Sequence, residues 1–322
     1  MRRRELIALL AGAVAARWHP AGAQQGEGPL VGLLHLAPND PTEHFLAAFR
    51  PFMKEHGREE GHNMRLLVAP AEGGGDRLAA AARELVAGKV DLIIVLGDPS
   101  IRAAQQATTT IPIVGMTDDM PGSKLVDSLA RPGGNTTGLS ILATELDVKR
   151  LELLHEAVPQ ASPIGILADL STISTRASLE AAARRLGVAL VIQSVGQVDE
   201  VGNAADELTK AGVKAVNVLA SPIIATASAA VIERLNRARL PAIYQWPDYA
   251  QQNGLLGYGP RLEACYRQTA ALADKILSGA KPADLPVEQP SKFELAVNLK
   301  TAKAIGLTLP QSFLARADQV IE

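Results

Sequence analysis

The sequence has a single cysteine, Cys265, among 322 residues. One thiol can neither form an intramolecular disulfide nor supply a cysteine-based zinc site, so both kinds of scaffold are excluded. Aromatic residues make up only 3% of the chain, and 32 Lys and Arg nearly balance 34 Asp and Glu. The net charge of −2 gives no electrostatic reason to expect a nucleic acid or an anionic membrane as a partner. What remains is a globular composition, 47% hydrophobic and long enough for two domains.

Motifs of the common enzyme chemistries are also missing. The sequence contains no GxSxG nucleophile elbow, no HExxH zinc motif, no GxxxxGK[ST] phosphate loop and no GxGxxG dinucleotide fingerprint. The six histidines are scattered without metal-ligand spacing, and the run Gly73-Gly74-Gly75 lacks the lysine of a phosphate loop. No acid, base and nucleophile are brought together by the sequence pattern. We therefore expect no catalytic residues, no metal, no cofactor and no enzymatic activity.

The first 23 residues have the layout of an export signal. Arg2 to Arg4 precede an apolar run from Leu6 to Ala16, and small residues end the segment at Ala21 to Ala23. The apolar run is too short to cross a bilayer, and no other stretch reaches eighteen uninterrupted apolar residues. The consecutive arginines resemble a twin-arginine signal, whereas the absence of the usual Phe fits a Sec-type signal, so both routes stay open.

Cleavage near Ala23 predicts a mature protein in the periplasm. The leader carries four arginines and one glutamate, so its removal takes the net charge from −2 to −5. No cysteine lies near the cleavage point to carry a lipid, and we expect no direct membrane anchor. The alternative is that this segment forms a first amphipathic helix of the mature fold, but it has neither a polar face nor a helix cap.

Beyond residue 28, short apolar runs alternate with longer alanine-rich stretches. This alternation predicts βαβ units and a parallel sheet, because strands buried on both faces read as nearly continuous apolar runs. The run from Val90 to Leu96 is a clear example. We expect strands at 30–36, 63–70, 90–96, 111–115, 164–168, 189–194, 215–220, 241–244 and 293–298, and helices at 42–56, 76–87, 101–108, 174–186, 198–211, 225–238 and 300–305.

The second half of this pattern repeats the first. VGLLHLAPND at 31–40 reads like IGILADLSTI at 164–173, and VDLIIVLGDPSIRAA at 90–104 reads like VKAVNVLASPIIATA at 213–227. An approximate duplication predicts an α/β fold with two doubly wound parallel-sheet lobes joined by a multi-crossing hinge. The expected crossings lie near 138–143, near 251–257 and in the Pro-rich stretch 281–290, which divides the chain into 28–140 plus 255–282 for the first lobe and 141–254 plus 283–322 for the second.

Five blocks of the sequence carry a resemblance to a known family. They are VDLIIVLGDPSIRAAQQATTTIPIV at 90–114, LVDSLARPGGNTTGLS at 125–140, KRLELLHEAVP at 149–159, ILSGAKPADLPVE at 276–288 and VNLKTAKAIGL at 297–307, with LARPGGNTTG the most specific. In this order they resemble the solute-binding proteins of bacterial ABC transporters with a type I periplasmic binding fold. More narrowly, they resemble the branch that includes tryptophan-binding transport proteins.

The resemblance implies a protein that holds a small organic ligand between its lobes and delivers it to an ABC transporter permease. The implied ligand is an amino acid or an aromatic or apolar carboxylate. Two positions depart from the family pattern: Gly97-Asp98 stands where the family usually has Gly-Thr, and Ser221 stands where an Asp is common. Two other roles stay open, an exported sensor for a membrane receptor and an exported α/β enzyme that acts on a small molecule.

Ligands of open parallel sheets bind beyond the carboxyl ends of the strands, so the residues that follow each strand are the candidates. Ser100, at the start of a helix, is the hydroxyl donor expected for a ligand carboxylate. Asp98 is either a helix cap or a partner for a ligand amine, and Asp118 beside Asp119 suits a cation or begins a turn. The other first-lobe candidates are His35, Asn39, Asp40, Thr137 and Ser140, with a cap before Pro41 as the alternative role of Asp40.

In the second lobe, polar candidates follow two strands and aromatic candidates follow two others. An aromatic side chain at a strand end stacks a flat or apolar ligand, and Trp246 is the expected example. The alternative for Trp246 is packing in the interlobe core. Tyr258, flanked by two glycines, is the other aromatic candidate. The complete second-lobe set is Asp169, Ser171, Thr172, Ser221, Trp246 and Tyr258.

Overall fold

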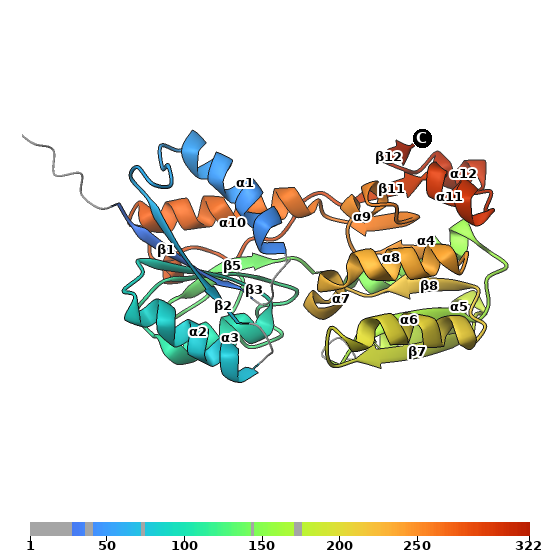
Figure 1. The fold of residues 1–322 in the computed structure, drawn as a ribbon, viewed down its shortest axis with the longest axis horizontal. Coiled ribbons are helices and arrows are strands. Elements are labelled where there is room, and N and C mark those ends of the chain that lie inside the picture. The colour runs from blue at the N-terminus through green and yellow to red at the C-terminus, as the bar shows by residue number, and fades with distance from the viewer. Residues whose placement is uncertain (1–27, 36–40, 72–74, 143–144, 171–175) are drawn as a thin grey trace, which may run out of the picture.

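The computed structural model describes residues 28–35, 41–71, 75–142, 145–170 and 176–322, and these form two α/β lobes that lie side by side (Figure 1). The expected leader lies outside the described residues. No helix in these ranges has the length and apolar character needed to cross a membrane.

The first lobe is built on a five-stranded parallel sheet with the order β2-β1-β3-β4-β5. Helices α1 and α10 cover one face and α2 and α3 cover the other (Figure 1). Alternate residues of a strand serve the two faces, so Ile94 packs with α1 and Ile93 packs with α2 and α3. The elements are β1 Leu30–His35, α1 Pro41–Glu55, β2 Arg65–Pro70, α2 Gly75–Ala87, β3 Leu92–Leu96, α3 Asp98–Ala107, β4 Ile113–Thr117, β5 Thr136–Ser140 and α10 Leu262–Leu277.

The second lobe has a seven-stranded sheet with the order β12-β11-β10-β9-β8-β6-β7, in which β10 and β11 run antiparallel. Helices α4 and α5 pack on one face and α6 and α8 on the other. The elements are α4 Glu145–Ala157, β6 Ile164–Asp169, α5 Arg176–Leu186, β7 Leu190–Val195, α6 Glu200–Lys210, β8 Ala215–Val218, α7 Pro222–Thr226, α8 Ser228–Arg237, β9 Ala242–Tyr244, α9 Asp248–Gln251, β10 Leu256–Gly259, β11 Glu294–Asn298, α11 Leu299–Ile305, α12 Gln311–Leu314 and β12 Gln319–Ile321. The short helix η2 Pro282–Asp284 packs on β5 of the first lobe.

The predicted duplication is visible in the strand order. The first sheet runs β2-β1-β3-β4-β5, and the second contains the corresponding run β7-β6-β8-β9-β10. Each run is parallel throughout. The expected α/β fold with two doubly wound lobes is confirmed.

The strand pairing differs from the expected lobe boundary at residue 255. Strand β10 pairs with β9 and β11, so it belongs to the second sheet, and only the helix α10 after it packs on the first lobe against α1. The boundary was misplaced because an apolar run identifies a strand but does not show which sheet it joins.

The third crossing between the lobes is fastened to the outer strand of the first sheet. The backbone of Glu288 pairs with β5 through Gly138 O and Ser140 N, both at 2.9 Å. Its carboxylate accepts hydrogen bonds from Lys275 Nζ at 2.9 Å and Gln268 Nε2 at 3.1 Å, both from α10. The first lobe therefore continues past residue 282, which the sequence placed as its end.

Candidate functional site

The carboxyl ends of the parallel strands β1 to β5 and β6 to β10 face the other lobe, whereas β11 and β12 run in the opposite direction. In Figure 1 the arrows of β5 and β8 point toward the facing lobe. The residues that follow these ends are here called the interlobe boundary. The two lobes approach each other closely at this boundary, since a Cβ atom added to Gly97 after β3 would lie 3.3 Å from Cγ of Pro222 after β8. Candidate side chains from both lobes thus meet the same region.

Helix α3 brings unused hydrogen-bonding groups to the interlobe boundary. It begins at Asp98, and its N-cap is Gly97, which makes no side-chain capping bond. Gly97 has φ 86°, a left-handed value that glycine adopts without strain. Ser100, in the first turn, is fully buried and its Oγ has no hydrogen-bond partner. Pro99 has no N–H, so the Ser100 hydroxyl, the backbone N–H groups of the other residues in this turn and the positive end of the helix form a suitable environment for a carboxylate.

Asp98 does not cap α3, which was one of the two roles that the sequence left open for it. Gly97 occupies that position, and the Asp98 carboxylate instead accepts a hydrogen bond from the hydroxyl of Thr117 at the end of β4. This bond links the ends of two neighbouring strands, and it leaves an acidic group beside the boundary.

Two of the predicted ligand residues use their hydroxyl groups within the first lobe. Ser140 Oγ donates to Asp118 O at 2.9 Å and accepts from Met120 N at 3.2 Å, which holds the loop after β4. Thr137 lies near the beginning of β5, away from the boundary, and its Oγ1 donates to Leu285 O at 2.8 Å. Both residues therefore have a structural role, because their hydroxyl groups form hydrogen bonds with backbone groups that are distant in sequence.

A buried ion pair lies on the second-lobe side and was missed from the sequence. Asp147 and Arg150 in α4 are both fully buried, and Arg150 Nη2 donates to Asp147 Oδ1. Arg150 Nη1 also donates to Tyr258 O at 3.1 Å, while Asn217 Nδ2 donates to Asp147 O at 3.1 Å. Asp147 Oδ2 has no hydrogen-bond partner. The sequence did contain an indication of this burial, because residues 147, 150, 151 and 154 have the spacing of one helix face that points inward.

Burial is the main cause of an altered acidity at Asp147. Loss of water raises the pKa of this carboxyl to about 6, although Arg150 acts in the opposite direction. The negative charge of Asp118, from the first lobe, raises it further, and the backbone N–H of Ala220 lowers it. Groups from both sides of the boundary therefore affect the pKa of Asp147.

The remaining polar candidates of the second lobe are buried near strand ends. Ser221 caps α7, with its Oγ accepting from Ile224 N at 3.2 Å, and its own N–H donates to Gln245 Oε1 at 3.0 Å. The hydroxyl of Ser221 is thus occupied by a helix terminus. Asp169 ends β6 and is 1% exposed.

The aromatic side chains after β9 are buried. Trp246 is 5% exposed and belongs to a hydrophobic cluster with members from both lobes, which agrees with interlobe packing, the alternative to ligand stacking. Tyr244 and Tyr249 meet edge to face at 5.9 Å, and burial raises the pKa of both phenols, that of Tyr249 to about 12. Tyr258 is partly buried against the other cluster of this lobe.

The side chains of five predicted ligand residues are not described by the structure. His35 is the last residue of β1, and its side chain is not among the described ones. Asn39, Asp40, Ser171 and Thr172 lie outside the described residues.

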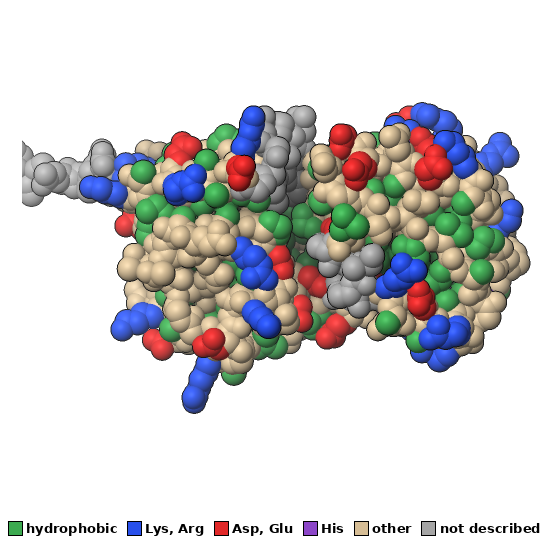
Figure 2. Space-filling model, turned by 90° about the horizontal axis from the view of Figure 1, so that it is seen from below, with side chains coloured by type: hydrophobic (Ala, Val, Ile, Leu, Met, Phe, Trp, Pro, Cys, Tyr) green, Lys and Arg blue, Asp and Glu red, His purple; other side chains and the backbone are tan. Residues whose placement is uncertain are grey.

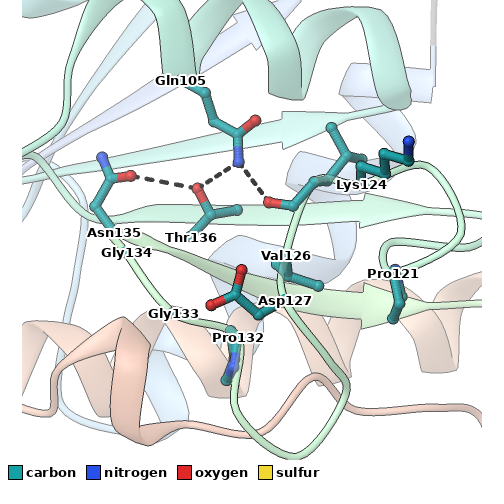
Figure 3. Close-up of a pocket in the computed structure, with 11 residues that line it drawn as sticks. Gln105, Pro121, Lys124, Val126, Asp127, Pro132, Gly133, Gly134, Asn135 and Thr136 are labelled. Carbon is teal, nitrogen blue, oxygen red and sulfur yellow. Dashed lines mark hydrogen bonds between the residues drawn. The ribbon is translucent and has the colours of Figure 1, made fainter.

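The LARPGGNTTG block forms part of a pocket of about 400 Å³ between α3 and the chain that joins β4 to β5 (Figure 3). Gln105 Nε2 donates to Leu125 O at 2.7 Å and to Thr136 Oγ1 at 3.0 Å. Asn135 Nδ2 donates to Ile111 O at 2.7 Å and to Thr108 O at 3.1 Å. These amides hold neighbouring loops together, so the most family-specific block of the sequence is structural here. No group of three His, Cys, Asp or Glu in the described ranges could hold a metal ion.

Comparisons with known proteins cover most of the chain. A family model described as ABC transporter substrate binding protein matches residues 40–321. A tyrosine-binding protein of Clostridioides difficile (strain R20291) is 27% identical over 285 residues, 86% of this chain and 81% of that protein.

Solved structures agree with the fold. A conserved domain protein of Vibrio cholerae has a TM-score of 0.83 and 26% identity, covering 91% of this chain and 99% of that one. An ABC domain from Streptococcus pneumonia in complex with L-Trp has a TM-score of 0.81 and 24% identity, covering 91% and 100%. The family resemblance drawn from the five sequence blocks is confirmed.

Proposed function

The chain belongs to the family of ABC transporter substrate-binding proteins, and we propose that it captures a small organic ligand between its lobes and delivers it to an ABC permease. In this proposal residues 1–23 direct export to the periplasm and are removed there. The ligand is an amino acid, with an aromatic side chain as the preferred class. The names of two relatives support this class, since one is a tyrosine-binding protein and the other was solved with L-Trp.

The observation that carries the proposal is the start of α3. Its amides lack a side-chain cap, and the Ser100 hydroxyl is buried without a partner. A buried donor without an acceptor destabilises a protein, and a ligand carboxylate would remove that cost. Because Gly97, the residue before α3, lies close to Pro222 of the second lobe, a ligand bound here would contact both lobes.

Such a ligand would favour the arrangement in which the lobes are closed. It binds that arrangement more tightly than an open one, because it meets groups of the second lobe only when the lobes are together. A micromolar affinity corresponds to about 8 kcal/mol. A few charge-assisted hydrogen bonds and the burial of one apolar side chain are sufficient to supply it.

The proposal is tested with the mature chain, residues 24–322. Native mass spectrometry would identify a ligand retained during purification, and calorimetric titration with the twenty amino acids would measure binding. We expect at least one amino acid to bind and to raise the melting temperature with increasing concentration. Mass spectrometry after incubation should recover that ligand unchanged, whereas a new product would support an enzyme.

Replacement of Ser100 by alanine should weaken binding without weakening the fold. The loss of one hydrogen bond to a charged group predicts about a 10- to 100-fold rise in Kd. The melting temperature of the ligand-free protein should stay the same or rise slightly, because the variant removes a buried hydroxyl that has no partner. Calorimetry on the amino acid bound by the wild type measures the effect.

Ser278→Ala is the matched control for this variant. Ser278 also lies in the first lobe, but its Oγ accepts a hydrogen bond from Arg58 beyond the end of α10. It should bind the ligand as the wild type does. Equal affinities of Ser100→Ala and the wild type would show that the start of α3 is not the carboxylate site.

A further inference from the structure

Aspartates from both lobes gather at the interlobe boundary. Figure 2 shows exposed acidic side chains beside the boundary between the two lobes, whereas Asp147 and Asp169 are buried and are not seen there. Arg150 is paired with one of these aspartates, and Arg261, at the end of β10, is bonded to Glu294 at 2.6 Å. The local field therefore favours a positively charged group. The four aspartates are Asp98 and Asp118 in the first lobe and Asp147 and Asp169 in the second.

Among these groups, Asp147 has a buried carboxylate oxygen without a hydrogen-bond partner. It lies in the first turn of α4, directly after the chain enters the second lobe. Arg150 occupies Oδ1, whereas Oδ2 is buried without a hydrogen-bond partner. A buried carboxylate oxygen in this state gains most from a donor that carries a positive charge.

We propose that Asp147 Oδ2 receives the ammonium group of the ligand and thereby makes the site selective for ligands with a primary amine. This inference rests on the proposed function and names a residue that was not among the sequence candidates. Together with a carboxylate site at the start of α3, it places the two charged groups of an amino acid on opposite lobes. Each group would then bind fully only when the lobes are closed.

The same geometry predicts a dependence on pH. Asp147 is acted on by Arg150 from its own helix, by Asp118 from the loop after β4 and by the N–H of Ala220 after β8. Burial raises the pKa of Asp147 to about 6 in the ligand-free protein. Below that pH the carboxyl is protonated, and an ammonium ligand must displace the proton in order to bind. Affinity for such a ligand should therefore fall as the pH decreases through 6.

The first test uses the wild-type mature protein and needs no substitution. L-tyrosine, L-tryptophan and their deaminated analogues, 3-(4-hydroxyphenyl)propanoate and indole-3-propanoate, are titrated calorimetrically between pH 5 and pH 8. At pH 8 the amino acid should bind at least about tenfold more tightly than its analogue. Its Kd should rise about tenfold at pH 5, because only about a tenth of Asp147 is ionised one unit below its pKa. The analogue should change by less than about threefold.

The second test replaces Asp147 by asparagine, with Glu145→Gln as the matched control. Glu145 is an exposed acid in the same helical turn, so its variant should behave as the wild type does. Asp147→Asn should bind the amino acid about 10- to 100-fold more weakly and should lose the preference for the amine. The variant should also lose the pH dependence, which a purely structural role of Asp147 would leave in place.

The outcomes separate this inference from the proposed function. Failure of the wild type to bind any amino acid would contradict both. Equal binding of the amino acid and its deaminated analogue would overturn the inference alone, and so would an unchanged pH profile in Asp147→Asn. A wild-type profile that is flat between pH 5 and pH 8 would also overturn it.

Discussion

Arg150→Ala is expected to lower the free energy of unfolding by about 3–5 kcal/mol, the usual cost of removing one partner of a buried ion pair. Arg150 is fully buried, and its guanidinium holds both the Asp147 carboxylate and the Tyr258 carbonyl. Alanine would leave both acceptors without this donor and would open a cavity between α4 and the sheet. Urea denaturation at pH 7 measures the loss. Lys149→Ala, which removes a half-exposed neighbour 3.7 Å from Glu152, should cost less than about 1 kcal/mol.

The size of this destabilisation depends on the protonation of Asp147. At lower pH Asp147 is protonated, so the charge left behind by Arg150→Ala disappears. The destabilisation should therefore be smaller at pH 5 than at pH 7. In addition, Asp147→Leu combined with Arg150→Met should recover most of the lost stability, because two apolar side chains replace two buried charges. An equal loss for Arg150→Ala and Lys149→Ala would show that the pair contributes little.

Gly138→Ala is expected to destabilise the first lobe strongly. Gly138 in β5 lies opposite Gly115 in β4, and a Cβ atom at Gly138 would lie 1.8 Å from Gly115 O. The obstructing atom belongs to the backbone of a buried strand, so it cannot rotate away. Overpacking costs about 1–3 kcal/mol where neighbours can adjust, and we expect at least the upper end here. Soluble yield and urea denaturation measure the effect.

Gly134→Ala provides a control from the same sequence block. Nothing lies within 4 Å of a Cβ atom at Gly134, although its φ of 57° disfavours alanine. This variant should lose only about 1–2 kcal/mol, the cost of a left-handed residue with a side chain. Similar losses for the two variants would contradict the close approach of β4 and β5 as the reason for glycine at 138.

The strands and the duplication were predictable from the sequence, because burial on both faces leaves a local record. The run from Leu92 to Leu96 is apolar since adjacent side chains enter different clusters on the two sides of the sheet. The like-reading segments at 90–104 and 213–227 became β3 and β8 with the helices after them. The assignment of β10 was not predictable, because strand pairing is a contact between distant segments.

For the candidate site, the sequence indicated residues but not their hydrogen bonds. The sequence correctly indicated that Ser100 begins a helix after a buried strand, and the structure left its hydroxyl without a partner. It also nominated Thr137, Ser140 and Ser221, whose hydroxyl groups are all hydrogen-bonded to backbone. Asp147 was overlooked because a charged residue in a helix is ordinarily solvated, and only packing shows that this one is buried.

By itself, the sequence determined the order of strands and helices and the two related lobes, because apolar spacing and like-reading segments are written in the chain itself. The family was indicated by the resemblance of five sequence blocks. Only the tertiary structure decided which polar atoms have hydrogen-bond partners and which have none. A hydrogen bond is completed by partners that are distant in the chain, as when Leu285 accepts from Thr137. The free oxygens of Ser100 and Asp147 are known only once every neighbour is in place.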